Sequence, residues 1–120
     1  MAFRESLKNV VEKVDGAIGA VVMGFDGIAI DEYVSEASLV DVQLMAIEYA
    51  SLLKDIRKTI EILNSGEMQE VSITTDNYRV VARPVSDDFF LALVLDANGN
   101  FGKGRYLLKQ SVPSIREALQ

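Results

Sequence analysis

The chain has 120 residues, of which 49% are hydrophobic and 25% charged, proportions that exclude a disordered protein and predict a globular one. It contains no cysteine and no histidine, which excludes disulfides, thiolate nucleophiles, Ser-His-Asp catalysis and zinc sites built from those residues. Twelve Lys and Arg against eighteen Asp and Glu give a net charge of −6, so we expect no nucleic-acid partner.

The composition also bears on compartment and chemistry. No run approaches the ~20 apolar residues of a membrane span, and the first residues, MAFRESLK, are charged where a secretory signal has its apolar region. We therefore expect one cytoplasmic domain over residues 1–120, without direct membrane insertion. The residue types present assemble no nucleophile–base pair or metal-ligand set, so we expect no enzyme, no cofactor and no metal.

The first third of the chain predicts a helix followed by a β-hairpin. Residues 2–14 carry apolar side chains at helical spacing, and the glycine of Asp15-Gly16 suits the helix end. Residues 17–25 (AIGAVVMGF) and 28–34 (IAIDEYV) are two strand-like runs separated by Asp26-Gly27, a strong hairpin signal. The first run is apolar throughout and is expected inside a sheet. The second alternates and then becomes acidic.

Residues 38–64 predict the longest element, a helix without Gly or Pro. Ser38 is its predicted N-cap, with Asp41 at the third helical position. Asn64-Ser65-Gly66 supplies the stop. At 27 residues and 1.5 Å per residue, such a helix would be ~40 Å long and would span a domain of this size.

The remaining chain predicts three strands and a final helix. The strands are 68–75, 78–85 and 89–96, joined by short polar turns. Residues 104–119 show helical spacing, but Pro113 predicts a kink or break within them. The order helix, two strands, long helix, three strands, helix predicts an α+β layered domain with a five-stranded antiparallel sheet and one long central helix.

This order resembles the Roadblock/LC7 family, and within it the bacterial proteins of the MglB type. The residues that carry the resemblance are the hairpin GAIGAVVMGFDGIAIDEYV at 16–34, the uninterrupted helix at 38–64, and FFLALVLD at 89–96 followed by NGNFGKGRYLLK at 98–109. The resemblance covers nearly the whole chain and depends on the order of elements more than on any single motif.

The resemblance implies a homodimer whose two sheets join edge to edge through residues 68–75, with the two long helices side by side. It also implies a small Ras-like GTPase as partner. Members of the MglB type stimulate GTP hydrolysis by repositioning the catalytic residues of the GTPase, without supplying an arginine finger. Other family members are structural adaptors with no effect on hydrolysis, and that alternative stays open here.

The strand at 68–75 also indicates dimerisation by itself. Its only charged residue is Glu70, and it contains no Lys or Pro that would protect a sheet edge from pairing. We therefore predict a dimer interface at Glu70, Val71, Ser72, Ile73 and Thr74.

Apolar side chains occupy more than one face of the predicted long helix. At about 100° per residue, most of them fall in one arc of roughly 160° that we expect to face the sheet. This arc contains Leu39, Val42, Met45, Ala46, Tyr49, Ala50, Leu52, Leu53, Ile56, Ile60 and Leu63. The opposite side carries Val40, Leu44 and Ile47, with Asp41 and Glu48 beside them. We interpret these five residues as the partner-binding site.

Two alternatives to this partner site remain. The row of Val40, Leu44 and Ile47 can instead be used up by the dimer contact. The partner site would then move to the acidic hairpin around Asp31 and Glu32, or to the basic final helix. A third function, sensing of a small ligand in a cavity between helix and sheet, is disfavoured because apolar faces normally pack shut.

The remaining candidate functional residues are explained by ordinary structural roles. Gly99, Gly102 and Gly104 around Lys103 loosely suggest a phosphate cradle, but their spacing fits no phosphate-binding motif, and a flexible strand-to-helix loop is the favoured explanation. Arg79 and Arg83 lie in a predicted strand, where structural pairing is a simpler role than that of an arginine finger.

Charge is unevenly distributed along the chain. Residues 14–53 contain seven acids and no Lys or Arg, whereas residues 97–120 contain four Lys and Arg against one acid. The basic residues of this last segment are Lys103, Arg105, Lys109 and Arg116. They either orient an encounter with a partner or simply keep the last helix soluble.

Overall fold

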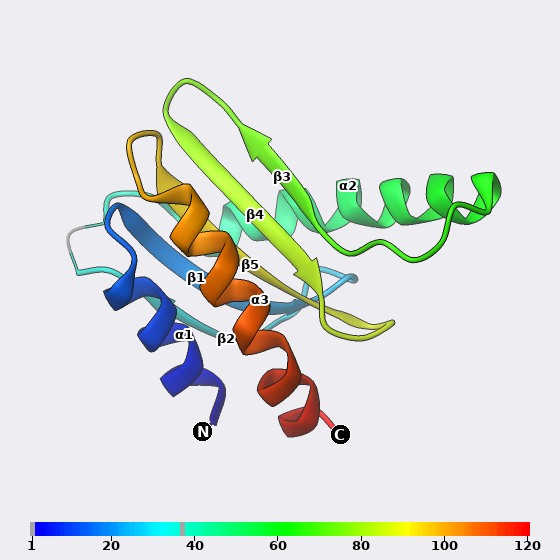
Figure 1. Ribbon diagram of the computed structural model, residues 1–120, viewed down its shortest axis with the longest axis horizontal. Coiled ribbons are helices and arrows are strands. Elements are labelled where there is room, and N and C mark those ends of the chain that lie inside the picture. Colours follow the sequence, from blue (N-terminus) through cyan, green and yellow to red (C-terminus); the bar gives the residue numbers. More distant parts are fainter. Residues whose placement is uncertain (1, 37) are drawn as a thin grey trace.

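The computed structural model describes residues 2–36 and 38–120, which form three helices and one five-stranded sheet. In chain order the elements are α1 (Ala2–Lys13), β1 (Ala17–Gly24), β2 (Ala29–Val34), α2 (Val42–Leu63), β3 (Val71–Thr74), β4 (Tyr78–Pro84), β5 (Phe89–Asp96) and α3 (Phe101–Ala118). The strands are antiparallel and lie in the order β2-β1-β5-β4-β3. Helices α1 and α3 cover one face of the sheet and α2 lies on the other (Figure 1). The predicted fold class and element order are confirmed.

The two central strands, β1 and β5, supply core side chains to both faces of the sheet. On β1, Ala20 and Val22 point into a cluster with α1 and α3, whereas Val21 and Met23 point into a cluster with α2. This alternation follows from the two-residue period of a strand. Full burial of such apolar side chains contributes roughly 1.5–3 kcal/mol each, so both helical layers are held by the same two strands.

The outer edge of β2 is protected against pairing. Its register with β1 shifts so that Ile30 is an extra, bulged residue. The N–H of Glu32 donates to Asp31 Oδ1 (2.8 Å), and Asp31 also pairs with Arg4 of α1 (3.3 Å). A bulge and a capping carboxylate are both features that hinder a second strand from adding to an edge.

The outer edge of β3 has no comparable protection within the described residues. The N–H of Thr75 donates to Tyr78 O (2.9 Å), and hydrogen-bonded pairs alternate along an antiparallel ladder. The N–H groups of Ser72 and Thr74 therefore point away from β4, toward solvent. Strand β3 is also shorter than the predicted 68–75, because Pro84 has no N–H with which to extend the ladder.

The predicted start of the long helix was wrong. Asp41, and not Ser38, is the N-cap of α2, since its carboxylate accepts from the N–H of Leu44 (3.0 Å). The Ser38 hydroxyl instead bonds the N–H of Val40 (3.1 Å) in the turn before the helix. The helix is thus 22 residues long and ends, as predicted, at Asn64, which adopts a left-handed conformation.

The final helix begins at Phe101 and continues through Pro113, so of the predicted kink or break the break does not occur. Asn100 caps it by accepting from the N–H of Lys103 (3.2 Å). Pro113 lies inside the helix, where it is exposed, so the carbonyl that loses its partner one turn earlier lies on the solvent side and can bond water. Gly104 is buried in the first turn, where an added Cβ would lie 3.0 Å from Leu93 Cδ2.

Glu70 connects the segment before β3 to both β4 and α3. Its Oε1 accepts from Arg83 Nη1 (3.0 Å), and its Oε2 accepts from Arg105 Nε (2.9 Å). Burial acts to raise the pKa of Glu70, but the guanidinium groups of Arg105 and Arg83 outweigh it, and the pKa lies below its ordinary value. A carboxylate with a lowered pKa stabilises the folded state while it is ionised.

The substitution Glu70→Gln is expected to lower the free energy of unfolding by about 1 kcal/mol at pH 7. The contribution of Glu70 is fully present above its unfolded-state pKa, near 4.5, and is lost as pH falls through the lower folded-state value. Urea unfolding of both proteins at neutral pH and near pH 3 checks this, because the difference should shrink in acid. Glu61→Gln, on the exposed part of α2, is the matched control. An equal difference at both pH values would contradict the assignment.

Candidate protein-interaction surfaces

The sheet covers a much narrower face of α2 than the sequence predicts. Only Val42, Ala46, Ala50 and Leu53 are buried. The C-terminal half of the helix extends past the edge of the sheet (Figure 1). The predicted sheet-facing arc is therefore wrong for its outlying members. Leu39 precedes the helix and is fully exposed.

Five residues of that arc that are not fully buried form an apolar row, which we call the lateral stripe: Met45, Tyr49, Leu52, Ile56 and Leu63. Leu52 is 44% exposed and Leu63 is 68% exposed, while the others are half-buried. The steps of four, three, four and seven residues are those of a helix–helix seam. Such spacing is typical of surfaces that pack against a second helix.

The lateral stripe lies on the side of α2 nearest the free sheet edge. Met45 and Tyr49 pack against the small cluster of Val42, Val80 and Val94, and Val71 of β3 packs against the larger buried cluster under α2. The opposite flank of the helix faces the β1–β2 turn, because a Cβ on Gly27 would lie 3.8 Å from Ile47 Cγ2. The stripe and the β3 edge are therefore neighbouring surfaces.

The predicted partner site is only partly assembled. Leu44 and Ile47 lie together on the outer side of α2, where they are 53% and 39% exposed, and Glu48 is exposed beside them. Asp41 is the helix cap, so it has a structural role at this position. Val40 precedes the cap and is half-buried, so the expected three-residue row on the helix is wrong at Val40. We call Leu44 and Ile47 the outer stripe.

Sequence reasoning missed one apolar neighbour of the outer stripe. Ile28, in the β1–β2 turn next to Gly27, is 63% exposed. Ile28 and Ile30 alternate in the sequence, but Ile28 lies in the turn before β2 and Ile30 is the bulged residue of β2, and both side chains are exposed. No sequence signal distinguishes a bulged strand from a regular one here. The surface around Ile47 is thereby wider than α2 alone.

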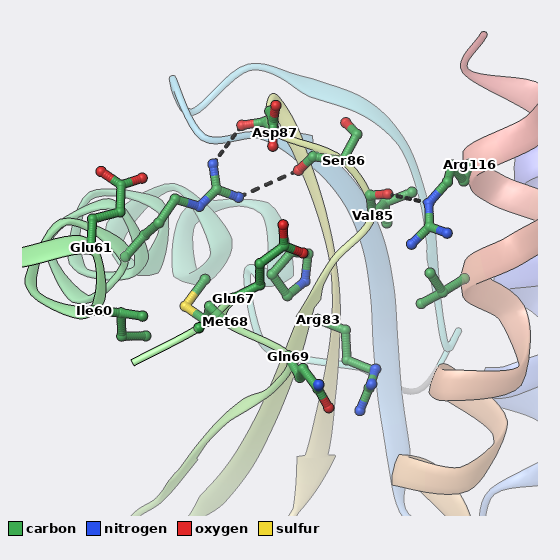
Figure 2. Close-up of a pocket in the computed structure, with 14 residues that line it drawn as sticks. Ile60, Glu61, Glu67, Met68, Gln69, Arg83, Val85, Ser86, Asp87 and Arg116 are labelled. Carbon is green, nitrogen blue, oxygen red and sulfur yellow. Dashed lines mark hydrogen bonds between the residues drawn. The ribbon is translucent and has the colours of Figure 1, made fainter. Parts of the chain in front are cut away.

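A hollow of about 470 Å³ lies where α2, the segment before β3, the β4–β5 turn and α3 meet. Arg57 of α2 donates to Ser86 O (3.3 Å) of the turn, and Arg116 Nε of α3 donates to Val85 O (2.7 Å) (Figure 2). The guanidinium of Arg57 also lies 3.7 Å over the ring of Phe25. Two arginines from opposite faces of the sheet thus hold one turn, and the hollow opens between them.

The described residues offer little chemistry for catalysis. No group of three or more His, Cys, Asp or Glu side chains among them is placed to hold a metal ion. Gly102, Lys103 and Gly104 form the first turn of α3, and the Asn100 side chain accepts from the Lys103 N–H, so a phosphate cradle is not formed there. Within the described chain, no helix is both long and apolar enough to cross a membrane.

Comparison with known proteins identifies the family to which this chain belongs. The sequence model of the Roadblock/LC7 domain matches residues 5–95, which is more than half of the chain. The chain belongs to the Roadblock/LC7 family. The resemblance predicted from the hairpin, the long helix and the final strand is confirmed. In this Roadblock/LC7 protein, the sheet is β2-β1-β5-β4-β3 and the long helix is α2.

Solved structures agree with this assignment. MglC from Myxococcus xanthus has 44% sequence identity to this Roadblock/LC7 protein, and the match has a TM-score of 0.73 and covers 98% of this chain and 99% of that one. The gliding protein MglB from Thermus thermophilus has 16% identity, a TM-score of 0.83, and coverage of 95% and 85%. A Roadblock/LC7 domain from Streptomyces avermitilis has 17% identity, a TM-score of 0.83, and coverage of 96% and 95%. A comparison with curated protein sequences gives no match.

Proposed function

We propose that this Roadblock/LC7 protein is a non-catalytic regulator of a small Ras-like GTPase and that it acts as a homodimer. The observation that carries the proposal is that α2 has two separate apolar stripes that the sheet leaves uncovered. Two such stripes on one helix need two covering surfaces. We assign the lateral stripe to a second copy of the chain and the outer stripe to the GTPase.

The dimer contact combines the β3 edge with the lateral stripe. Outward N–H groups at Ser72 and Thr74 can pair with a second β3, and Val71 and Ile73 are half-buried on that strand. The edge and the stripe are neighbours, so joining two sheets through β3 brings two α2 helices side by side. Glu70 contributes through its ion pairs, which hold the segment before β3 in place.

The outer stripe then remains available for the GTPase. Leu44, Ile47 and Ile28 form an apolar centre, with the carboxylates of Glu48 and Asp41 at its margin. An apolar centre with a charged rim is the usual composition of a protein interface. The acidic rim would set the rate and salt dependence of binding to a basic partner surface.

Regulation by this protein would act through binding alone. Arg79 and Arg83 belong to β4, where they contact Phe101 and Glu70, so neither lies on a loop that could reach into a partner's nucleotide site. An arginine finger requires such reach. The protein would instead reposition the GTPase's own catalytic residues, as the resemblance to the MglB type implies.

A structural dimeric adaptor, without effect on GTP hydrolysis, is the second candidate. It is kept because the effect on hydrolysis is implied by the MglB type, and the identity to the MglB structure is 16%, against 44% to MglC. The two candidates share the dimer and differ only in what binding does to the GTPase.

The substitution Leu44→Asp separates these possibilities. We expect it to abolish binding to a small Ras-like GTPase from the same genome and to leave the dimer intact, because it places a charge at the centre of the outer stripe only. Calorimetry measures binding, light scattering measures mass, and GTP turnover is followed with and without the protein. Ile62→Asp is the matched control, since Ile62 is also exposed on α2 but lies about 27 Å further along the helix.

Each outcome has a clear meaning. A monomeric Leu44→Asp protein would show that the outer stripe belongs to the dimer interface and would overturn the assignment. Binding of the wild-type protein without any change in GTP turnover would favour the adaptor. Turnover by the wild-type protein alone would contradict the non-catalytic role.

A further inference from the structure

Four arginines line the flank of α3 that faces the outer strands, on the opposite side of the sheet from α2. Arg79 of β4 lies 4.0 Å over the ring of Phe101, at the start of α3, and Arg105 lies 5.7 Å over the same ring. Arg105 lies one helical turn after Phe101 on α3. It shares the carboxylate of Glu70 with Arg83 of β4.

The fourth arginine, Arg116, lies at the far end, where it bonds Val85 O just after β4. We call Arg79, Arg105, Arg83 and Arg116 the arginine track. Positions 79 to 85 of a strand span roughly 20 Å, which sets the length of the track.

The track has more positive charge than its own carboxylates neutralise. Glu70 serves Arg83 and Arg105 together. Arg79 donates through Nε to Thr74 Oγ1 (3.4 Å), and Arg116 donates through Nε to Val85 O (2.7 Å). For the terminal amino groups of Arg79 and Arg116, no hydrogen-bond acceptor occurs among the described residues. Both ends of the track therefore present free guanidinium donors.

The surface beside the track is polar and borders the β3 edge that we assign to the dimer. Ser72 pairs with Val81, whose side chain points into the α1/α3 cluster, so the Ser72 hydroxyl lies on the same face as the track. Ser72 and Thr74 are exposed. At the Arg116 end the track meets the hollow, whose walls include Val112 and Met68 (Figure 2). Hydroxyls thus lie along the track and an apolar recess lies at its end.

The arginines are held in place before any ligand binds. Stacking on Phe101 orients Arg79 and Arg105, and hydrogen bonds to Glu70 and Val85 orient Arg83 and Arg116. Side chains that are already ordered lose little conformational entropy on binding. The track already binds one carboxylate of the protein itself, because Glu70 bridges the guanidinium groups of Arg83 and Arg105.

We propose that the arginine track binds an acidic segment of another protein, with carboxylates at Arg79 and Arg116 and an apolar side chain in the hollow. A span of about 20 Å corresponds to roughly six extended residues. This site lies on the α3 face, so it is independent of the GTPase surface on α2 and adds a second binding function.

Charge favours a short acidic segment over larger polyanions. The chain carries a net charge of −6, which repels nucleic acid and anionic membranes as a whole. A short segment lies within about 10 Å of the track and, at ordinary ionic strength, is screened from more distant acids. The acids that line the hollow, Glu61, Glu67 and Asp87, favour an apolar group there rather than a carboxylate.

Fluorescence anisotropy tests the proposal with a labelled, Glu-rich peptide of about twelve residues that contains leucines. We expect binding that weakens as salt increases, and a loss of about tenfold or more in the double variant Arg79→Gln/Arg116→Gln. The matched control, Lys54→Gln/Lys58→Gln, makes the same change in net charge on α2 and should leave the affinity within about twofold. In amide NMR spectra, the signals of Ser72 and Thr74 should shift on binding.

Several results would overturn the proposal. These are equal loss in the Lys54/Lys58 control, tighter binding to phosphatidylserine vesicles or single-stranded DNA than to the peptide, and salt-sensitive self-association in place of peptide binding. Arg79→Lys/Arg116→Lys keeps the charge and should bind with intermediate affinity, and it substitutes for the Gln variant if that variant unfolds. Binding of the GTPase should be the same in all track variants, which separates this test from that of the proposed function.

Discussion

Ser72→Pro is expected to convert the proposed dimer to a monomer of half the mass at micromolar concentration. The N–H of Ser72 points away from β4, so proline removes a donor from the free edge and places its ring where a second strand would pair. The β3–β4 ladder is made by the flanking residues and should persist. Light scattering over a range of concentrations measures the mass, and circular dichroism confirms the fold.

Two controls make this result specific to the β3 edge. Ser72→Val keeps the N–H and should remain dimeric. Glu32→Pro makes the same kind of change on the β2 edge, where the N–H of Glu32 already bonds Asp31, and should also remain dimeric. A folded Ser72→Pro protein that stays dimeric would place the contact on the lateral stripe alone. A wild-type monomer at every concentration would remove the basis for the proposed dimer.

Phe90→Ala is expected to lower the free energy of unfolding by roughly 3–5 kcal/mol, the usual cost of emptying a buried aromatic site. Phe90 is fully buried, and its ring lies 5.2 Å from that of Phe25, on which Arg57 stacks. The substitution therefore weakens the core beneath α2 and also loosens the contact that holds α2 to the β4–β5 turn. Such a loss is a large fraction of the 5–15 kcal/mol typical of a domain.

Urea unfolding measures this effect, with Phe89→Ala as the matched control. Phe89 is the preceding residue on the same strand but is only half-buried, so the same truncation should cost much less. We also expect Phe90→Ala to weaken binding of the GTPase, because α2 carries the outer stripe. Equal costs for the two substitutions would contradict the assigned position of Phe90 in the core.

Local patterns in the sequence determined most of the secondary structure. Strand β5 covers the predicted residues 89–96, and the hairpin around Asp26-Gly27 and the helix end at Asn64 lie where predicted. These features depend on residue period and turn chemistry over a few neighbouring residues, and such signals are present in any short stretch of chain. The unprotected β3 edge was likewise visible as a strand without Lys or Pro.

Predictions failed where the result depended on what surrounds an element. Ser38 and Asp41 are both good capping residues, and the turn that follows Ser38 decided between them. Pro113 does not break α3, because it lies on the exposed side of a helix that the sheet already holds. In each case the local preference was real, and tertiary contacts determined which preference prevailed.

The candidate sites, too, were determined partly by the sequence and partly by the tertiary structure. A helical wheel placed the apolar residues of α2, apart from Ile62, on two faces, but only the tertiary structure showed that the sheet ends beneath the middle of the helix and leaves the lateral stripe uncovered. The arginine track joins residues of β4 and α3 that are more than twenty positions apart, since Arg79 and Arg105 meet over one ring. Sequence alone determined the elements and their apolar faces. The packing of α2 and α3 on opposite faces of one finite sheet decided which of those faces stay free.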